Sequence, residues 1–361
     1  MTIPLVDVQS QYEPLIPELE ARFRSVLESG AFIRGPEYRA FEEEAAAYLG
    51  VGRAIGVANG TDALVLVLDA LEIGPGDEVI CPAFTFYATA ESIARRGATP
   101  VFADVDSATL NLDPDDVAAK VTDRTRAIMP VHLFGRPAPL DPLLELGVPV
   151  IEDAAQAFGS PGVAQKGAVA TYSFYPTKNL FCLGDGGLVA TSDEDLADRV
   201  RMLSFHGSRD KVDFDFVGYN SRLDELQASF LRVFLLHLDE WNSGRRDAAA
   251  RYAELGLGEL VDLPEDEAGH IYHLFVCRSP ERDRIVAALA ENAIGTATYY
   301  VTPLHLQPAL RYLGYEPGSL PVTEQVAREN FSVPLWPTIS TEQQERVIDV
   351  VRSAVGVAAR A

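Results

Sequence analysis

Short apolar runs alternate with helix-period stretches over the first two-thirds of the chain. Residues 53–59 (RAIGVAN) have the pattern of a strand, and residues 61–71 (TDALVLVLDAL) have that of a helix beginning at a Gly-Thr cap. The pairing recurs in the strand-like DEVICP and the helical residues 86–97, and the runs TPVFADV, TRAIMPVHL and VPVIEDA supply further apolar strands. Strands that are apolar on both faces and alternate with helices indicate a parallel sheet covered on each side. Such a sheet binds its ligands at the carboxyl ends of its strands.

The pattern changes in the last third of the chain. A turn and strand (GDGGLVATSD) and a helix (DEDLADRVRML) are followed by one long helix over residues 224–241, and the periodicity breaks around residues 242–246. Beyond this point one helix (RDRIVAALAENA), a few strands and several prolines favour a smaller α+β domain. We therefore predict an α/β protein with a large domain over residues 1–245 and a small C-terminal domain over residues 246–361.

Charge and composition exclude several classes of partner. The chain of 361 residues has a formal net charge of −23, so nucleic acid and anionic membrane surfaces are poor partners. It contains no apolar run of transmembrane length, and from the first residues, which lack a basic start and a long apolar region, we expect no export signal. The three cysteines lack the spacing of a metal site or a disulfide framework, so we expect a cytoplasmic protein without a metal. An anionic ligand must then be held by local donors against an unfavourable overall field.

Lys178 stands in an unusual setting, the segment TYSFYPTKNL. Phe174, Tyr175, Leu180 and Phe181 flank it, so we expect partial burial, which lowers the pKa of a lysine. A lysine with a lowered pKa is a nucleophile toward aldehydes and can hold one as a Schiff base. Because an isolated lysine is almost always a solvated surface charge, this interpretation depends on the residues that accompany it.

Two other segments supply complementary groups. In NGTDAL, Gly60 and Thr61 lie at the entry of a helix directly after a strand, where free N–H groups and the helix dipole favour a phosphate. Ser173 is a possible second phosphate donor, and a plain helix cap is the alternative for NGTDAL. In VIEDAAQAFG, Asp153 falls where an apolar strand ends, and Gln156 lies three residues later on the same face of a helical turn. Taken alone, Asp153 would more often be a helix cap.

A phosphate seat, a lysine that captures an aldehyde and a carboxylate for a ring nitrogen together describe a site for pyridoxal 5′-phosphate (PLP). The carboxylate of Asp153 would keep the ring nitrogen protonated, so that the ring accepts electrons when the substrate Cα–H bond breaks. Gln156 is neutral and can donate to the ring oxygen without cancelling that effect. Lys178, once a substrate amine displaces it, would become the base that moves the proton.

The chain resembles the sugar aminotransferases of the DegT/StrS family, which have the fold of aspartate aminotransferase (PLP fold type I). The resemblance implies a mixed, mostly parallel sheet in the large domain. It runs almost end to end, with one departure: the stretch SPGVAQKGAVA is shorter than its counterpart in relatives. The motifs that carry it are SGAFIRGPEYRAFEEE, NGTDAL, CPAFTFYATAE, VHLFG, VIEDAAQAFG, SFYPTKNL, GDGG, GYNSRLDELQA and TPLHLQP.

The resemblance also implies roles by position. Lys178 would form the Schiff base, Asp153 would pair with the ring nitrogen, and Gln156 would bond the ring hydroxyl. The further contacts implied are the phosphate contacts of Gly60, Thr61 and Ser173, stacking of Phe86 on the ring, a contact of Asn220 with the phosphate of the neighbouring subunit's cofactor, and a sugar contact of His305. The contact of Asn220 implies a homodimer with shared active sites. For His305, a buried hydrogen-bonded structural role is an equal alternative.

The function implied is amination of a nucleotide-linked keto-sugar, with glutamate as the amino donor. The N-terminal pattern and the loop over residues 33–36 (IRGP) are more similar to relatives that aminate carbon 3, which favours a dTDP-linked 3-keto-6-deoxyhexose as acceptor. Aminotransferases for carbon 4 or for cyclitols are the near alternatives. Relatives that act as dehydrases with pyridoxamine phosphate replace the lysine with histidine, so Lys178 disfavours that reaction. The intact Lys178, Asp153 and Gln156 disfavour a non-catalytic regulator.

Overall fold

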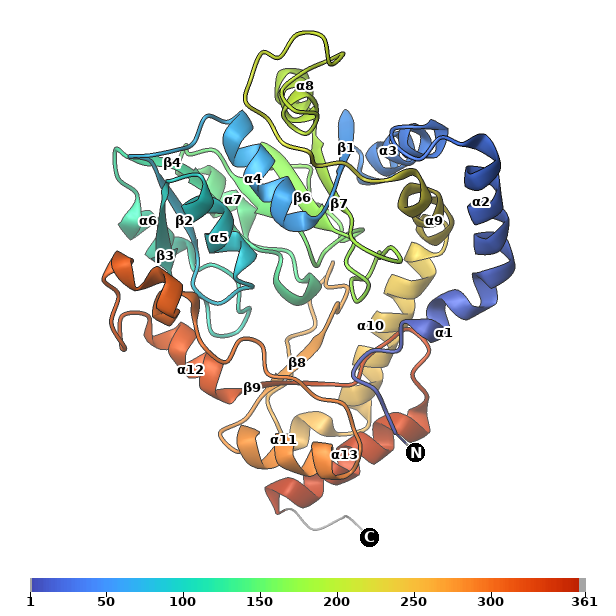
Figure 1. The fold of residues 1–361 in the computed structure, drawn as a ribbon. Helices are drawn as coiled ribbons and strands as arrows, with labels where there is room; N and C mark the ends of the chain where they lie inside the picture. Colours follow the sequence, from blue (N-terminus) through green and yellow to red (C-terminus); the bar gives the residue numbers. More distant parts are fainter. Residues whose placement is uncertain (1, 357–361) are drawn as a thin grey trace.

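A mixed sheet forms the centre of the computed structural model, which describes residues 2–356 (Figure 1). One part of the sheet has the strand order β1 (Arg53–Val57), β7 (Gly187–Thr191), β6 (Val169–Ser173) and β5 (Ile151–Asp153). The other part has the order β3 (Thr99–Ala103), β2 (Glu78–Pro82) and β4 (Thr125–Ile128). Parallel bridges between Ile128 and Val150 and between Val131 and Asp153 join the two parts. The strand β7 pairs antiparallel with both its neighbours, and the other pairings are parallel, as expected for this fold class.

Alternating side chains of the strands pack into different layers of helices. Ile55 and Val189 share a buried cluster with the helices α4 (Gly60–Ala70), α5 (Ala88–Arg95) and α8 (Glu194–Leu203). Ala54 and Leu188, one residue earlier on the same strands, pack with the layer on the opposite face. The helices of that layer are α2 (Ile16–Ser29), α3 (Pro36–Leu49) and α9 (Glu225–Leu235), with α6 (Pro114–Lys120) and α7 (Leu140–Leu144) beside β2 and β4. The expectation of a sheet covered on each side is confirmed.

The single long helix predicted over residues 224–241 is wrong. The structure has two helices, α9 and α10 (Leu238–Glu254), separated by a turn at Leu236 and His237. The N–H groups of these two residues bond carbonyls three residues earlier, which tightens the last turn of α9 and ends it. The change of direction brings Trp241 against Phe181 and Phe234 in the core. Apolar periodicity alone did not reveal this break, because both helices continue the same buried pattern.

A smaller layer lies at the C-terminal end of the chain. It contains an antiparallel pair, β8 (Phe275–Arg278) and β9 (Asn330–Val333). Its helices are α11 (Arg282–Glu291), α12 (Pro321–Glu329) and α13 (Thr341–Val355). This content agrees with the predicted α+β character.

The predicted boundary at residue 245 falls inside α10, which continues from the large layer into the small one (Figure 1). Trp241 packs in the cluster beneath the sheet, whereas Tyr252, three turns later, packs in the cluster around β8 and β9. The N-terminal segment also lies with the small part, because Ile3 bridges Ile294 and is buried in the same cluster as Tyr252. The short helix α1 (Gln9–Tyr12) then leads back to α2. The division at residue 245 therefore stays a prediction, and the N-terminal residues pack with the C-terminal part.

The stretch over residues 160–170 folds around one buried carboxylate. Glu152 accepts hydrogen bonds from the N–H groups of Ala164 and Gly167 and lies 2.9 Å from Nε2 of His132. Burial favours a higher pKa for Glu152, but the contacts from His132 and the two N–H groups outweigh it and lower the pKa. The stretch is thereby fixed beside β5, the strand that carries Asp153.

Candidate active site

A cavity of about 1030 Å³ opens at the carboxyl ends of the central strands. It brings together residues from segments that are far apart in the sequence. Of the predicted site residues, those that line it are Gly60, Thr61, Phe86, Asp153, Gln156, Ser173 and Lys178. The position agrees with the rule that sheets of this kind bind ligands beyond the carboxyl ends of their strands.

The first turn of α4 forms one end of the cavity. Asn59 is the N-cap, and its side chain accepts a hydrogen bond of 2.8 Å from the N–H of Asp62, so the cap lies one residue before the predicted Gly-Thr pair. The N–H groups of Gly60 and Thr61 have no acceptor within residues 2–356. A Cβ at position 60 would lie 2.8 Å from Cβ of Ser173, so glycine permits this close approach. Two free N–H groups at a helix N-terminus, with a serine against them, fit a phosphate.

Lys178 reaches the cavity from the loop that follows β6. Burial lowers its pKa to about 8, and the negative charge of Asp153 opposes that shift. The partial burial and the lowered pKa predicted from its aromatic and apolar neighbours are both present. The amine is therefore more nucleophilic near neutral pH than an ordinary lysine.

Asp153 ends β5 with its carboxylate held at both oxygens. The hydroxyl of Thr89 donates to Oδ2 at 2.8 Å, and the N–H of Ala155 donates to Oδ1 at 3.3 Å. Burial raises the pKa of Asp153, whereas the bond from Thr89, the N–H of Ala155 and the positive charge of Lys178 act in the opposite direction. A buried carboxylate in this setting gains most from a cationic N–H group placed against it.

The amide of Gln156 has a defined orientation. Its Oε1 accepts a hydrogen bond of 2.6 Å from the N–H of Phe134, so Nε2, with its two N–H donors, is the end of the amide that faces the cavity. Nε2 lies 3.3 Å from the hydroxyl of Tyr300, which also lines the cavity. The fixed carbonyl oxygen means that this side chain can only donate toward the cavity.

These groups fit PLP in kind and in number. The free N–H groups of Gly60 and Thr61 suit its phosphate, Lys178 suits its aldehyde, and Asp153 suits its ring nitrogen. Phe86 is 59% exposed although it lines the cavity, so its face is available to stack on a ring. No group of three possible metal ligands occurs within residues 2–356.

Two predicted site residues are not among the residues that line this cavity. Asn220 is exposed and accepts a hydrogen bond from Arg222, so its role toward a second subunit stays a prediction. His305 is buried, with Nε2 3.2 Å from Glu324, and burial lowers its pKa. The structural alternative fits these contacts, because the ring is enclosed and lies against Glu324 of a neighbouring helix, and the sugar contact of His305 stays a prediction.

Sequence reasoning missed other residues of the cavity. Thr89, which holds Asp153, lies one helical turn after Thr85 in the motif CPAFTFYATAE, and that spacing was the only available signal. His273 and Tyr300 enter the cavity from the C-terminal part of the chain, where no motif pointed to them. Arg95 lies at the exposed side of the cavity with no ion-pair partner among the described residues.

Comparison with known proteins gives a consistent result over almost the whole chain. The sequence matches the DegT/DnrJ/EryC1/StrS aminotransferase family over residues 15–352. It is 44% identical to the dTDP-3-amino-3,4,6-trideoxy-alpha-D-glucose transaminase of Streptomyces venezuelae, covering 97% of this chain and 95% of that protein. It is also 45% identical to a protein of Geobacillus stearothermophilus named as a pleiotropic regulatory protein, covering 97% of this chain and 98% of the relative.

A solved structure agrees with the sequence comparison. The crystal structure of DesV from S. venezuelae in complex with a ketimine intermediate superposes with a TM-score of 0.95. The two chains are 43% identical, and the match covers 99% of this chain and 100% of the other. The fold and the arrangement of secondary structure are therefore shared along the full length.

Proposed function

The chain belongs to the DegT/DnrJ/EryC1/StrS aminotransferase family, and from this premise we propose that it aminates carbon 3 of a dTDP-linked 3-keto-6-deoxyhexose with L-glutamate as the amino donor. The family is PLP-dependent, and the protein is an aminotransferase. The observation that carries the proposal is the convergence of Lys178, Asp153 and the free N–H groups of α4 on one cavity.

The roles proposed for the side chains follow from their surroundings. PLP bound in this cavity supplies an aldehyde and a ring that accepts electrons from a breaking Cα–H bond. Lys178 holds that aldehyde through Nζ, and Asp153 holds the proton of the ring nitrogen. Gln156 donates from Nε2 to the ring oxygen, because the N–H of Phe134 fixes its Oε1.

Lys178 also moves a proton during each half of the reaction. Once an incoming amine displaces it, Nζ is a free base with a pKa lowered to about 8 by burial, so a useful fraction is unprotonated near neutral pH. In each half of the reaction this nitrogen would take a proton from one carbon and deliver it to another, and in the second half the receiving carbon is the one that becomes the amine-bearing centre. Tyr299 and Tyr300 line the same cavity from the C-terminal part of the chain.

The sugar assignment is supported by similarity and by the loop over residues 33–36. The relative from S. venezuelae that is 44% identical along nearly its full length is named for a 3-amino dTDP sugar. Ile33 bridges Asp224, and the N–H of Glu225 bonds the carbonyl of Phe32, so this loop lies against the segment that carries Asn220. Amination at carbon 4 and a cyclitol acceptor are the alternatives that the product analysis below distinguishes.

A dehydrase or a regulator fits the site less well. A dehydrase of this family would have histidine at position 178, whereas this chain has a lysine with a lowered pKa. A regulator without catalysis has no need for a buried Asp153 held by Thr89 or for a fixed Gln156. The regulatory name of the relative from G. stearothermophilus therefore gives no reason to place this chain outside catalysis.

We also propose a homodimer in which each active site uses residues of both subunits. Around Asn220, the cations Arg34, Lys211 and Arg222 lie over the ring of Phe205 at 4.4, 4.7 and 5.6 Å. Asn220 bridges Phe205, and none of the three cations has a carboxylate partner within residues 2–356. In a chain with a net charge of −23, such a cluster is suited to an anion from outside this chain, for which the cofactor phosphate of a second subunit is the proposed partner.

Exposed apolar side chains near this cluster favour a subunit contact. Phe32 and Ile33, and Val212, Phe214 and Val217 of the loop before Asn220, are all exposed. A contiguous group of exposed large apolar residues is typical of an interface. A two-fold contact would bring two such surfaces together and complete two sites at once.

We place the reaction in the cytoplasm. Cys81, Cys182 and Cys277 are buried free thiols, and burial raises the pKa of each of them. Unpaired thiols are typical of a reducing compartment. No described helix is long and apolar enough to cross a bilayer.

The test is a turnover assay of the PLP-loaded protein with glutamate and a panel of nucleotide keto-sugars. We expect amination of the dTDP-linked 3-keto-6-deoxyhexose, with NMR of the product showing the new amine at carbon 3. An amine at carbon 4, or turnover only with a uronate or a cyclitol ketone, would contradict the acceptor assignment and leave the aminotransferase assignment unaffected.

A further inference from the structure

The backbone over residues 133–136 lies as a thin layer between Gln156 and the C-terminal part of the chain. On one side, the N–H of Phe134 donates to Oε1 of Gln156 at 2.6 Å. A Cβ at Gly135 would lie 3.2 Å from the carbonyl oxygen of Gln156, 2.9 Å from the N atom of His273 and 2.7 Å from Cγ1 of Ile271. The Gly135 backbone therefore packs against Gln156 and against the segment over residues 271–273, and a shift of this backbone would change its contacts with both.

The other side of the layer is bonded to the segment over residues 265–271. The N–H of Ile271 donates to the carbonyl of Gly135 at 3.0 Å, and Nε2 of His270 lies 3.3 Å from the carbonyl oxygen of Phe134. Burial, reinforced by the charge of Arg136, lowers the pKa of His270 to about 3, so the ring is neutral near neutral pH and Nε2 can donate.

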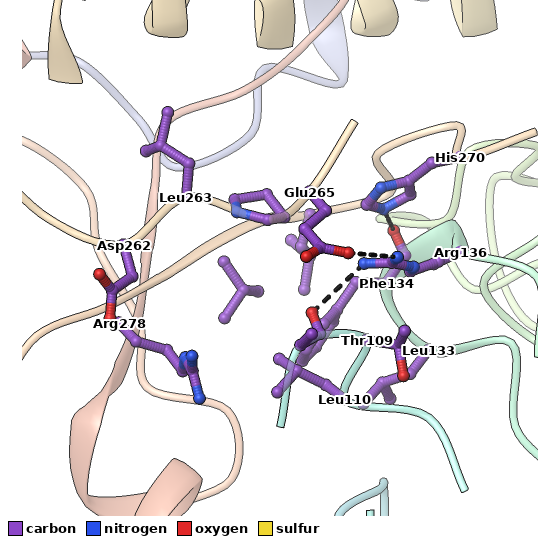
Figure 2. Close-up of a pocket in the computed structure, with 14 residues that line it drawn as sticks. Thr109, Leu110, Leu133, Phe134, Arg136, Asp262, Leu263, Glu265, His270 and Arg278 are labelled. Atoms are coloured by element: carbon purple, nitrogen blue, oxygen red, sulfur yellow. Dashed lines mark hydrogen bonds and ion pairs between the residues drawn. The ribbon is translucent and has the colours of Figure 1, made fainter. Parts of the chain in front are cut away.

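Arg136 fastens the end of this layer to the same segment. Its Nε donates to Glu267 at 2.5 Å, one terminal nitrogen lies 3.3 Å from Glu265, and the other donates to the carbonyl of Ala108 at 3.3 Å. Figure 2 shows the contact between Arg136 and Glu265, with His270 bonded to Phe134 beside it. The arginine side chain is 6% exposed, whereas Glu265 and Glu267 are 65% and 45% exposed. The contact therefore joins a buried cation to an exposed acidic segment.

The backbone over residues 133–136 depends on these ion pairs for its position, because it has unfavourable φ values and lies beside a cavity. Phe134 has φ of +57° and Gly135 has φ of +89°, and a residue with a side chain adopts the first value at an energetic cost. A cavity of about 140 Å³, lined by Leu110, Leu133 and Val276, lies directly against Phe134 and Arg136. Without the ion pairs, the backbone can relax into this space instead of being held by close packing.

We propose that Arg136 is a positioning residue for Gln156. Its ion pairs with Glu265 and Glu267 hold the Phe134 N–H against Oε1 of Gln156 and so keep Nε2 directed at the cofactor ring. The proposal rests on the role assigned to Gln156 under the proposed function. It makes the exposed acidic segment over residues 265–267 a part of the cofactor environment, although it does not line the cavity.

The visible absorption of the PLP-loaded protein tests this without any sugar substrate. Donation from Gln156 withdraws charge from the ring oxygen, which shares a proton with the lysine-derived nitrogen. When the donation is lost, the proton is held more tightly, and the pH midpoint of the absorption change rises. For Gln156→Ala we expect a rise of about one pH unit, the scale of one hydrogen bond to a charged oxygen. For Arg136→Gln we expect a smaller rise in the same direction, and Arg136→Lys should restore part of it.

The matched control is Arg53→Gln, because Arg53 also pairs with two carboxylates, Glu194 and Asp198, and is not among the residues that line the large cavity. Its midpoint should equal that of the parent protein. The double variant Glu265→Gln with Glu267→Gln removes the same ion pairs by changing the exposed partners. It replaces Arg136→Gln in the test if that variant does not fold, and we expect the same direction of change. A midpoint that moves in Gln156→Ala but stays at the parent value in the Arg136 and double-glutamate variants would overturn the role of Arg136. An unmoved midpoint in Gln156→Ala would overturn both this inference and the assignment of Gln156.

Discussion

The hydroxyl of Thr89 donates a hydrogen bond of 2.8 Å to Oδ2 of Asp153, and both side chains are buried. The bond joins the first turns of α5 to the end of β5. It fixes the plane of the carboxylate that we assign to the cofactor ring nitrogen, and it favours the charged form of that carboxylate. Thr89 therefore positions Asp153, a role that the motif CPAFTFYATAE did not by itself predict.

Replacement of Thr89 by valine should lower the rate of catalysis without preventing PLP from binding. Thr89→Val keeps the shape of the side chain but leaves Oδ2 of Asp153 without its buried donor, a loss of about 1–3 kcal/mol that corresponds to a decrease of kcat of about 5- to 150-fold. Steady-state kinetics with PLP in excess measure this. Thr89→Ser, which keeps the hydroxyl, is the control and should stay near the parent rate.

Asp153→Asn should separate cofactor binding from cofactor chemistry. The phosphate and lysine contacts remain, so PLP should still bind, whereas the ring nitrogen loses the charge that keeps it protonated. We expect the transamination rate to fall by about two orders of magnitude or more. Single-turnover kinetics with glutamate follow this step. Parent-like rates in Asp153→Asn would exclude the proposed pairing with the ring nitrogen.

Lys178→Ala should abolish the visible absorption of the lysine-bound cofactor and the adduct that borohydride traps. The turnover should fall to background, because no other lysine lines the cavity within the described residues. Lys166→Ala is the matched control, since Lys166 is an exposed lysine paired with Asp141 at 2.5 Å. Peptide mapping after borohydride reduction locates the adduct. An adduct that persists in Lys178→Ala would show that another residue holds the cofactor.

The capture of PLP by the cofactor-free protein should depend on pH with a midpoint near 8. Burial lowers the pKa of Lys178 to about 8, and only the unprotonated amine attacks an aldehyde. The capture rate should thus rise about tenfold per pH unit well below 8 and level off above it. In Asp153→Asn the midpoint should move to lower pH, because the negative charge of Asp153 raises the pKa of Lys178. Stopped-flow absorption measures both profiles, and a midpoint near 10 would contradict the burial of this amine.

Hybrid dimers test whether the active site is shared. If Asn220 completes the site of the second subunit, a mixture of inactive Lys178→Ala and inactive Asn220→Ala proteins should regain activity. A mixed dimer then carries one site with both residues intact, and a random mixture should recover about a quarter of the parent activity if exchange is complete. Sedimentation of the parent protein establishes its assembly. A fully active monomer, or no recovery after demonstrated exchange, would rule out the shared site.

The sequence by itself was sufficient for those features that depend on short spans of chain. The apolar runs predicted β1 and β2, because a strand that is buried on both faces is mostly apolar. The aromatic and apolar neighbours of Lys178 predicted its burial and lowered pKa. The position of Asp153 at the end of an apolar run placed it at the carboxyl edge of the sheet, where the structure has it.

Only the tertiary structure decided the features that depend on contacts between distant segments. The direction of β7 and the break between α9 and α10 follow from packing, since an antiparallel strand or a turned helix has the same local pattern as the alternative. The bond from Thr89 to Asp153 and that from Phe134 to Gln156 join residues that no local periodicity relates. The contact of His305 with Glu324 is likewise one that no local sequence pattern predicted. Local sequence determines which side chains are available, whereas the packing of the elements determines which of them come within hydrogen-bonding distance of one another.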